Sequence, residues 1–180
     1  MKYQFPEKQG LYDPQFEHDN CGVGFVVQIK NIQSHQIVQQ GLRLLCNLNH
    51  RGALGADPDS GDGSGIMLQI PHQFFVEECQ KEGFYLPEAG EYGIASIFLP
   101  QEPSARRHCG GVIESHIVEK GMDLLGWRDV PRDLGFVGKQ ALSSMPAMRH
   151  LFMGHRRLGN YDQKKFERKL YITRKAIRTS

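Results

Sequence analysis

Residues 19–25 read Asp-Asn-Cys-Gly-Val-Gly-Phe, and this stretch decides how the chain is expected to fold. Before it lies a polar leader, residues 1–20, in which two prolines and a glycine interrupt any helix. After it, residues 22–29 (GVGFVVQI) are rich in β-branched side chains, which predicts a buried strand. Cys21 is either an ordinary buried thiol, or the chain is cut after Asn20 and Cys21 becomes a new N-terminus.

A cysteine at a new N-terminus would bring its own base. A thiol attacks as the thiolate, and a free thiol is mostly protonated at neutral pH. The α-amine has an ordinary pKa of about 7.7–8.0, which suits it to accept the thiol proton near neutral pH. Gly22 and Gly24 predict a crowded site, because glycine in a strand often marks close approach by another backbone or a ligand. The residues alone leave both interpretations of Cys21 open.

Hydrophobic periodicity predicts further helices and strands along the chain. Ser34 and Asp162 are expected to cap helices, Gly52 to end one, and Gly110-Gly111 to break or loosen another. The expected helices are 34–49, 71–81, 103–121 and a last one from Asp162 onward, and the expected strands are 66–70, 92–99, 122–130 and 148–153. The order predicts one domain that mixes α and β structure.

Composition excludes several classes of protein. The 180 residues suffice for one domain with a real core. A net charge of +2 argues against a dedicated nucleic-acid binder. The one basic run, residues 164–178, has helical spacing and is either a solvated helix face or a phosphate-binding patch.

Neither a membrane span nor an exported protein is predicted. No apolar run approaches the roughly 18 residues that a membrane span needs, and residues 1–20 hold no apolar stretch of signal-peptide length. A cytoplasmic, thiol-reducing setting is therefore expected. The four cysteines are widely spaced and form no Cys-x-x-Cys pair, so most are expected to be buried, inert thiols without disulfide or metal roles.

The glycine-rich run GDGSG, residues 61–65, matches no nucleotide-binding motif. No Gly-Lys-Ser/Thr follows it, and it precedes a predicted strand where a dinucleotide fingerprint would follow one. It is either a surface turn or a loop whose backbone approaches a site. Asp57, Asp59 and Asp62 lack the spacing of a calcium loop, and the histidines share no ligand spacing, so no metal site is predicted.

Three runs together resemble a known family. They are LYDPQFEHDNCGVGF (11–25), LNHRGALGADPDSGDGSGIMLQIP (48–71) and GWRDVP (126–131). They resemble the N-terminal part of the glutamate synthase large subunit, which begins with a class II glutamine amidotransferase domain. The resemblance covers nearly the whole chain, and the long second run at its distance from Cys21 is highly specific.

The resemblance implies an α+β fold of the N-terminal-nucleophile hydrolase type, with stacked antiparallel sheets between helices (αββα), incomplete in this chain. Residues 1–20 would be a propeptide, cleaved between Asn20 and Cys21, and residues 21–180 the N-terminal part of the amidotransferase domain. Cys21 would attack the glutamine carboxamide with its own α-amine as base. Ammonia would leave, a glutamyl thioester would form, and water would release glutamate.

The resemblance also assigns neighbours of the nucleophile. Arg51 matches the arginine of the family's His-Arg-Gly segment near the nucleophile, Gly52 is the adjacent backbone position, and Gly22 follows the nucleophile. A cation near Cys21 would favour its thiolate. Arg51 is alternatively a residue that only interacts with the helix dipole at a helix C-terminus.

The implied partners and cofactors belong mostly to the complete enzyme. Glutamine would be the substrate, and its ammonia would convert 2-oxoglutarate to glutamate in the remainder of the large subunit. This chain would hold no cofactor; FMN and an iron–sulfur cluster would act in the complete enzyme, with electrons from an NADPH-oxidising small subunit or ferredoxin. No nucleic acid or membrane partner is expected.

The sequence departs from the family at the oxyanion hole, which there comes from an Asn-Gly pair. No Asn-Gly occurs in this sequence, and loss of one oxyanion donor typically costs about 10²–10³ in rate. The family's arginine and aspartate that grip glutamine also lie further along the domain, so little activity is expected of this chain alone. A non-catalytic scaffold or interaction protein of the same fold is the alternative.

Overall fold

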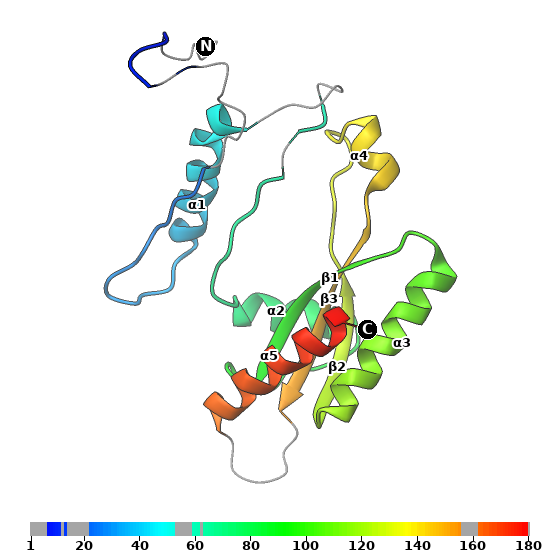
Figure 1. Ribbon diagram of the computed structural model, residues 1–180. Coiled ribbons are helices and arrows are strands. Elements are labelled where there is room, and N and C mark those ends of the chain that lie inside the picture. Colours follow the sequence, from blue (N-terminus) through cyan, green and yellow to red (C-terminus); the bar gives the residue numbers. More distant parts are fainter. Residues whose placement is uncertain are drawn as a thin grey trace. The chain divides into compact units, whose positions relative to one another are not determined.

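The structure is a computed structural model that describes residues 7–11, 13, 22–52, 59–61, 63–155 and 162–179. The chain divides into two compact units: unit 1 comprises residues 1–69 and 134–143, and unit 2 comprises residues 70–133 and 144–180. The elements in chain order are α1 (His35–Asn47), the 3₁₀ turn η2 (Asn49–Arg51), α2 (His72–Lys81), β1 (Tyr92–Leu99), α3 (Pro103–Glu119), β2 (Met122–Asp129), α4 (Lys139–Ser144), β3 (Ala147–His155) and α5 (Gln163–Thr179) (Figure 1). The prediction of an α+β protein is confirmed.

Unit 2 is built on a three-stranded antiparallel sheet in the order β1-β3-β2. β3 is central and pairs with both neighbours, so that Leu151 faces Ala95 on β1 and Trp127 on β2. The strand predicted at 92–99 is confirmed with its bounds, the one predicted at 122–130 ends one residue earlier, and the one predicted at 148–153 is longer at both ends.

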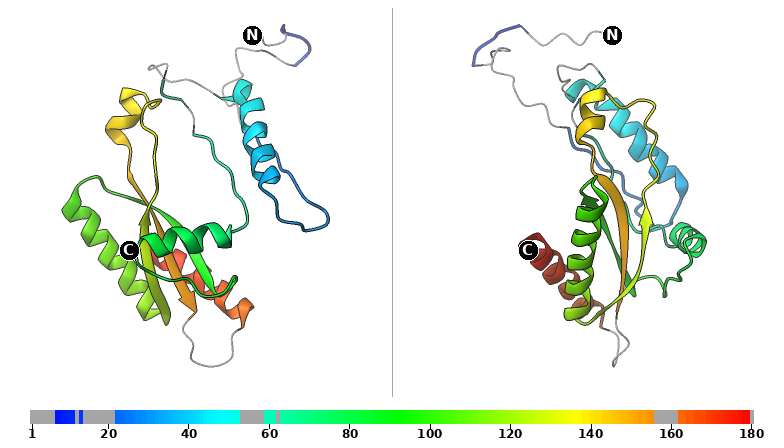
Figure 2. Two further views of the ribbon diagram at one scale, coloured as in Figure 1. Left: turned by 180° about the vertical axis from the view of Figure 1, so that it is seen from behind. Right: turned by 90° about the vertical axis from the view of Figure 1, so that its right-hand side faces the viewer.

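Helices cover both faces of this sheet. Consecutive apolar residues of β3 point to opposite faces, so each face needs a helix to bury its side chains. Leu151 and Met153 lie in one core cluster with Ile113 and Ile117 of α3 and with Phe166 of α5. Phe152 points to the opposite face and packs with Phe75 and Cys79 of α2. The edge-on view shows α3 and α5 on one side of the sheet and α2 on the other (Figure 2). Burying each large side chain contributes about 1.5–3 kcal/mol.

Two helices of unit 2 begin at acidic caps. The Glu102 carboxylate accepts hydrogen bonds from the backbone N–H groups of Ser104 (2.9 Å) and Ala105 (2.6 Å) at the start of α3. Asp162 Oδ1 accepts one from Lys165 N–H (3.2 Å) at the start of α5, which confirms the predicted cap. These bonds satisfy N–H groups that have no partner inside the helix.

The predicted break in α3 is wrong. The helix runs without interruption through Gly110 and Gly111 to Glu119. Each helical glycine costs up to about 1 kcal/mol relative to alanine. The buried side chains of Ile113 and Ile117 one turn later offset that cost.

Unit 1 contains α1 but neither of its two predicted strands. The prediction of α1 is confirmed, although the Ser34 side chain makes no capping hydrogen bond. Residues 22–28 and 66–70 are irregular, so those two strand predictions are wrong. A strand is stable only when neighbouring strands satisfy its backbone groups, and no other segment of the described residues pairs with these two. Val23, Phe25 and Ile29 are consequently 90%, 86% and 95% exposed.

The short helix α4 was not predicted from the sequence, because its six residues show no apolar periodicity. Within the part of the chain that the structure describes, no helix has the length and apolar character needed to cross a bilayer.

Candidate functional site

The structure describes only some of the residues proposed for catalysis. Asn20 and Cys21 lie outside the described residues. Gly22, Arg51 and Gly52 lie within them, all in unit 1. The described part of the site therefore consists of Gly22, which follows Cys21, and the end of α1.

Gly22 lies directly against the turn that ends α1. A Cβ atom on Gly22 would be 2.9 Å from Leu48 Cδ2 and 3.4 Å from Arg51 Cβ. The first distance is shorter than real Cβ atoms show, so a larger residue at position 22 would displace the end of the flexible Leu48 side chain. The chain thereby brings the neighbour of Cys21 against the first carbon of the Arg51 side chain.

Gly24 is packed still more tightly. A Cβ atom there would be 2.6 and 2.7 Å from the two Cδ atoms of Leu44, one turn before Leu48. A close approach at Gly22 and Gly24 is found, but the approaching groups are side chains of Leu48, Arg51 and Leu44, so the predicted approach by another backbone is wrong. The segment after Cys21 thus follows the apolar face of α1 from its C-terminal end.

Arg51 is placed by the backbone of η2. Its N–H donates to the Leu48 carbonyl oxygen (2.8 Å), and the Gly52 N–H donates to the Asn49 carbonyl oxygen (3.2 Å). A cation at this C-terminal turn also interacts favourably with the helix dipole. The geometry therefore fits both roles considered for Arg51, and they are compatible.

Gly52 is the C-cap of η2 and not of α1, and it caps that turn without the left-handed conformation that favours glycine. Leu48 is the C-cap of α1, and Gly52 follows η2 with φ −87° and ψ 147°, an extended conformation open to any residue. A Cβ on Gly52 would make only an ordinary 3.5 Å contact with the Asn49 carbonyl oxygen. Glycine at position 52 is therefore not required by the described neighbours.

The glycine-rich loop contacts α4. Ser60 Oγ accepts a hydrogen bond from the Ala141 N–H (3.4 Å), and the Asp59 carbonyl oxygen accepts one from the Gly138 N–H (3.1 Å). A Cβ on Gly63 or Gly65 would meet nothing within 4 Å, which favours a surface turn there. Asp57 and Asp62 lie outside the described residues.

A cavity of about 430 Å³ lies between residues 22–26, α1 and residues 65–68. The side chains that line it are apolar, including Val23, Leu44, Leu48 and Met67. Glutamine carries an ammonium and a carboxylate, which need charged partners when desolvated. The cavity wall within the described residues does not supply them, so the cavity suits an apolar segment better than the substrate.

No metal or cluster site occurs in the described part of the chain: no three His, Cys, Asp or Glu residues gather there. Burial raises the pKa of the Cys79 thiol to about 11, so this cysteine is inert, as predicted. Cys46 on α1 is exposed instead, and Cys109 is half-buried.

The run GWRDVP supports the scaffold of unit 2. Arg128 is 4% exposed, forms an ion pair with Glu78 of α2, and lies 5.7 Å from the centre of the Phe74 ring. Hydrogen bonds from Lys81 and then Arg128 lower the pKa of the Glu78 carboxyl. These contacts tie β2 to α2. The sequence analysis missed them, because an arginine in a motif gives no sign of its partner.

The Trp127 ring is held on the other face of the sheet. Its Nε1–H donates to Glu114 Oε1 (2.6 Å), and the Arg149 guanidinium lies 5.0 Å from the ring centre. Arg149 also pairs with Asp129 (2.7 Å). Three consecutive motif residues thus join β2 to α3, α2 and β3.

Comparison with known proteins identifies the family. The model of the class II glutamine amidotransferases matches residues 21–180. The chain belongs to the class II glutamine amidotransferases. It is 45% identical over 172 residues to the glutamate synthase [NADPH] large chain of Bacillus subtilis, 40% over 174 residues to the glutamate synthase [NADH] of Schizosaccharomyces pombe, and 38% over 172 residues to the ferredoxin-dependent glutamate synthase 1 of Arabidopsis thaliana.

These alignments cover 94–96% of the chain but only 8–11% of the relatives. The similarity to glutamate synthases inferred from the three sequence runs is thereby confirmed. Within this class II glutamine amidotransferase, η2 carries the His-Arg-Gly run and β2 carries the Gly-Trp-Arg-Asp run. The first run lies beside the residue after Cys21, and the second holds the sheet of unit 2 together.

Proposed function

We propose that this chain is the glutaminase part of a glutamate synthase and that Cys21 is its nucleophile. The observation that carries the proposal is the contact of Gly22 with Leu48 and Arg51, which places an arginine side chain against the neighbour of Cys21. The family match, which starts at Cys21, is consistent with a mature domain that begins there. Residues 1–20 are then a propeptide removed between Asn20 and Cys21.

The reaction proceeds in two steps. The Cys21 α-amine accepts the thiol proton, and the sulfur attacks the glutamine carboxamide carbon. The C–N bond breaks, the nitrogen takes the proton and leaves as ammonia, and a glutamyl thioester remains. Water then attacks the thioester, gives a proton back to the sulfur and releases glutamate. The positive charge of Arg51 lowers the pKa of the thiol and increases its thiolate fraction.

The ammonia serves a second reaction in the remainder of the large subunit, where 2-oxoglutarate becomes glutamate. FMN and an iron–sulfur cluster would supply the redox chemistry there, outside the residues of this chain. The electron donor is an NADPH-oxidising small subunit or ferredoxin. The names of the relatives include NADPH-, NADH- and ferredoxin-dependent enzymes, so they support no single donor. A cytoplasmic location stays a prediction.

Low glutaminase activity of the 180-residue chain by itself is part of the proposal, because the sequence lacks the Asn-Gly pair. The same absence favours the second candidate, a non-catalytic scaffold or interaction protein of this fold. The two differ in the chemical state of Cys21, which an activity assay of this chain would miss.

Alkylation by a diazo-ketone glutamine analogue, followed by mass spectrometry, tests the proposal. In the full-length protein we expect loss of residues 1–20, labelling at Cys21 and protection by glutamine, while the exposed Cys46 gains no glutamine-protected label. Cys21→Ser should abolish the label. An intact leader with no protected label at Cys21 would refute the nucleophile and favour the scaffold.

Arg51→Ala and Arg51→Lys separate the two roles of Arg51. If its charge acts on Cys21, alanine raises the apparent pKa of Cys21 alkylation and lysine restores most of the effect. If Arg51 only stabilises the turn, both variants leave the alkylation pH profile unchanged, and thermal unfolding alone responds.

A further inference from the structure

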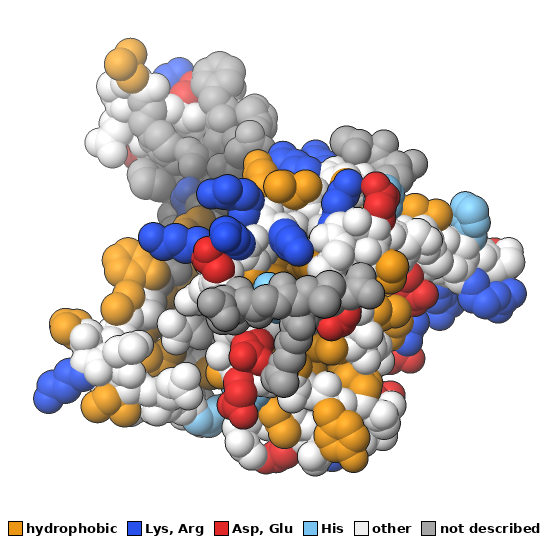
Figure 3. Space-filling model, turned by 90° about the horizontal axis from the view of Figure 1, so that it is seen from below, with side chains coloured by type: hydrophobic (Ala, Val, Ile, Leu, Met, Phe, Trp, Pro, Cys, Tyr) orange, Lys and Arg blue, Asp and Glu red, His pale blue; other side chains and the backbone are white. Residues whose placement is uncertain are grey.

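The exposed side of α5 carries an unusual concentration of positive charge. The helix contains seven Lys or Arg residues and one Glu, whereas the rest of the chain has fifteen Lys and Arg against nineteen Asp and Glu. All seven cations are exposed. Lys and Arg side chains gather on the face of the molecule shown in Figure 3. The charge is therefore a local property of α5, in an otherwise acidic chain.

The cations follow helical spacing. Phe166 and Thr173 are buried beneath α5, with Leu170 and Ile177 half-buried beside them. The opposite side presents Lys164, Arg168, Tyr171, Lys175 and Arg178, spaced 4, 3, 4 and 3 residues apart. This row, the basic face, extends about 21 Å at 1.5 Å per residue.

Helix stability does not account for the basic face. Neighbours three or four residues apart include like-charged pairs such as Lys164–Arg168 and Arg174–Arg178, and each such pair destabilises a helix by about 0.2–0.5 kcal/mol. Lys164 and Lys165 also lie in the first turn, where the helix dipole disfavours cations. Asp162 offsets this for Lys165, with which it pairs at 3.7 Å.

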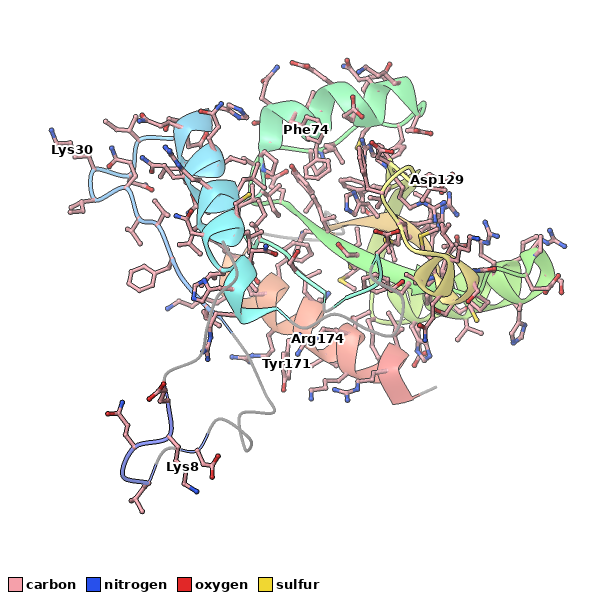
Figure 4. The ribbon with its side chains drawn as sticks, turned by 90° about the horizontal axis from the view of Figure 1, so that it is seen from above. Lys8, Lys30, Phe74, Asp129, Tyr171 and Arg174 are labelled. Carbon is pink, nitrogen blue, oxygen red and sulfur yellow. The ribbon has the colours of Figure 1, made fainter. Side chains whose placement is uncertain are left out.

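The centre of the basic face has the composition of a binding hot spot. Tyr171 is 56% exposed and Ile172 47% exposed. Arg174 and Lys175 lie 5.4 and 5.8 Å from the centre of the Tyr171 ring, and the view from above shows Tyr171 and Arg174 together on α5 (Figure 4). Tyrosine and arginine are enriched where protein partners dock.

We propose that the basic face of α5 docks an acidic helix of a partner protein or partner domain. A facing helix has the same rise per residue, so carboxylates spaced 4, 7 and 3 residues apart meet the four cations in register, and the position between them that faces Tyr171 needs no charge. The sequence pI of 8.3 and the acidic remainder disfavour nucleic acid, whose binding domains usually exceed a pI of about 9. A bilayer is disfavoured because the apolar side of α5 is already covered by the sheet.

Fluorescence anisotropy of a labelled alanine-based peptide with four glutamates spaced 4, 7 and 3 residues apart tests this proposal in the full chain. A peptide of the same composition with scrambled glutamates is the geometric control. Lys164→Glu/Arg168→Glu/Lys175→Glu removes the basic face. Lys30→Glu/Arg43→Glu/Lys139→Glu changes the net charge equally at exposed cations outside α5.

We expect the patterned peptide to bind more tightly than the scrambled one, more weakly at higher salt, and about tenfold more weakly to the α5 variant, with the control variant unchanged. Equal losses in both variants, or equal binding of both peptides, would overturn the proposal. So would tighter binding of a DNA duplex or of phosphatidylserine vesicles at α5. If the triple variant does not fold, Arg168→Gln/Lys175→Gln against Lys30→Gln/Arg43→Gln gives the same comparison.

Discussion

Replacing Gly24 by alanine should disturb the packing of the segment that follows Cys21 against α1. The added Cβ would lie 2.6, 2.7 and 3.0 Å from Cδ1, Cδ2 and Cγ of Leu44. Carbon atoms in contact normally lie about 3.5–4.0 Å apart, so Leu44 or the backbone has to move.

The size of the effect follows from two opposing terms. Overpacking of this kind typically costs about 1–3 kcal/mol. Replacing glycine by alanine also stabilises the folded state by about 0.4–1 kcal/mol, because the unfolded chain then has less conformational entropy. We therefore expect Gly24→Ala to lower the free energy of unfolding of unit 1 by about 1–2 kcal/mol.

Urea unfolding combined with amide hydrogen exchange of α1 measures this change in the unit concerned. Gly63→Ala is the matched control, because a Cβ there meets nothing within 4 Å. Leu44→Ala should remove most of the penalty of Gly24→Ala, giving a coupling energy of about 1 kcal/mol in a double-mutant cycle. The reasoning is refuted if Gly24→Ala behaves like Gly63→Ala, or if its penalty persists unchanged beside Leu44→Ala.

Three further predictions concern unit 2. Gly110→Ala and Gly111→Ala should each stabilise α3 by about 0.5–1 kcal/mol, since a Cβ at either site meets nothing within 4 Å; unchanged thermal unfolding would contradict this. Glu102→Ala should destabilise α3 by about 1 kcal/mol in urea unfolding, unlike Glu102→Asp, because it removes the N-cap. Burial, and then the charge of Arg128, lower the pKa of His150 below its usual 6.5, so the folded state favours the neutral ring. The resulting stability is present above pH 6.5 and is lost as the pH falls below it; urea unfolding against pH should show a smaller loss in His150→Gln, and an equal loss would exclude His150 as the cause.

The sequence predicted the sheet of unit 2 well and the strands of unit 1 wrongly, for one physical reason. The strand Tyr92–Leu99 has apolar side chains on both faces of the sheet, and pairing with β3 satisfies its backbone hydrogen-bonding groups. Residues 22–29 are rich in β-branched side chains, but strand propensity reports fit to a pleated surface and supplies no partner. Without a partner in the described residues the segment is irregular, so the composition was read correctly and the inferred strand was wrong.

The candidate site shows the same limit at the level of single residues. The sequence predicted close packing at Gly24 because glycine in an apolar run is costly unless something needs the space. It could not name Leu44, because the pairing of residues 22–24 with the C-terminal half of α1 is a tertiary contact. Gly52 was predicted to cap the long helix, but it caps only the turn η2, and its φ of −87° does not require glycine.

The contrast between the His-Arg-Gly and Gly-Trp-Arg-Asp runs bears on how family motifs are interpreted. Both helped to identify the family, and each contains an arginine. Arg128 is buried, and an ion pair with Glu78 and a nearby Phe74 ring account for it. Removing Glu78 would leave the buried Arg128 charge without this partner, which destabilises the fold. Arg51 is half-buried, with its Cβ close to Gly22, and under the proposed function its charge acts on Cys21. Substitution of Arg128 should therefore lower stability first, whereas substitution of Arg51 should change the reactivity of Cys21 first, and that difference distinguishes a scaffold motif from a site motif in the same chain.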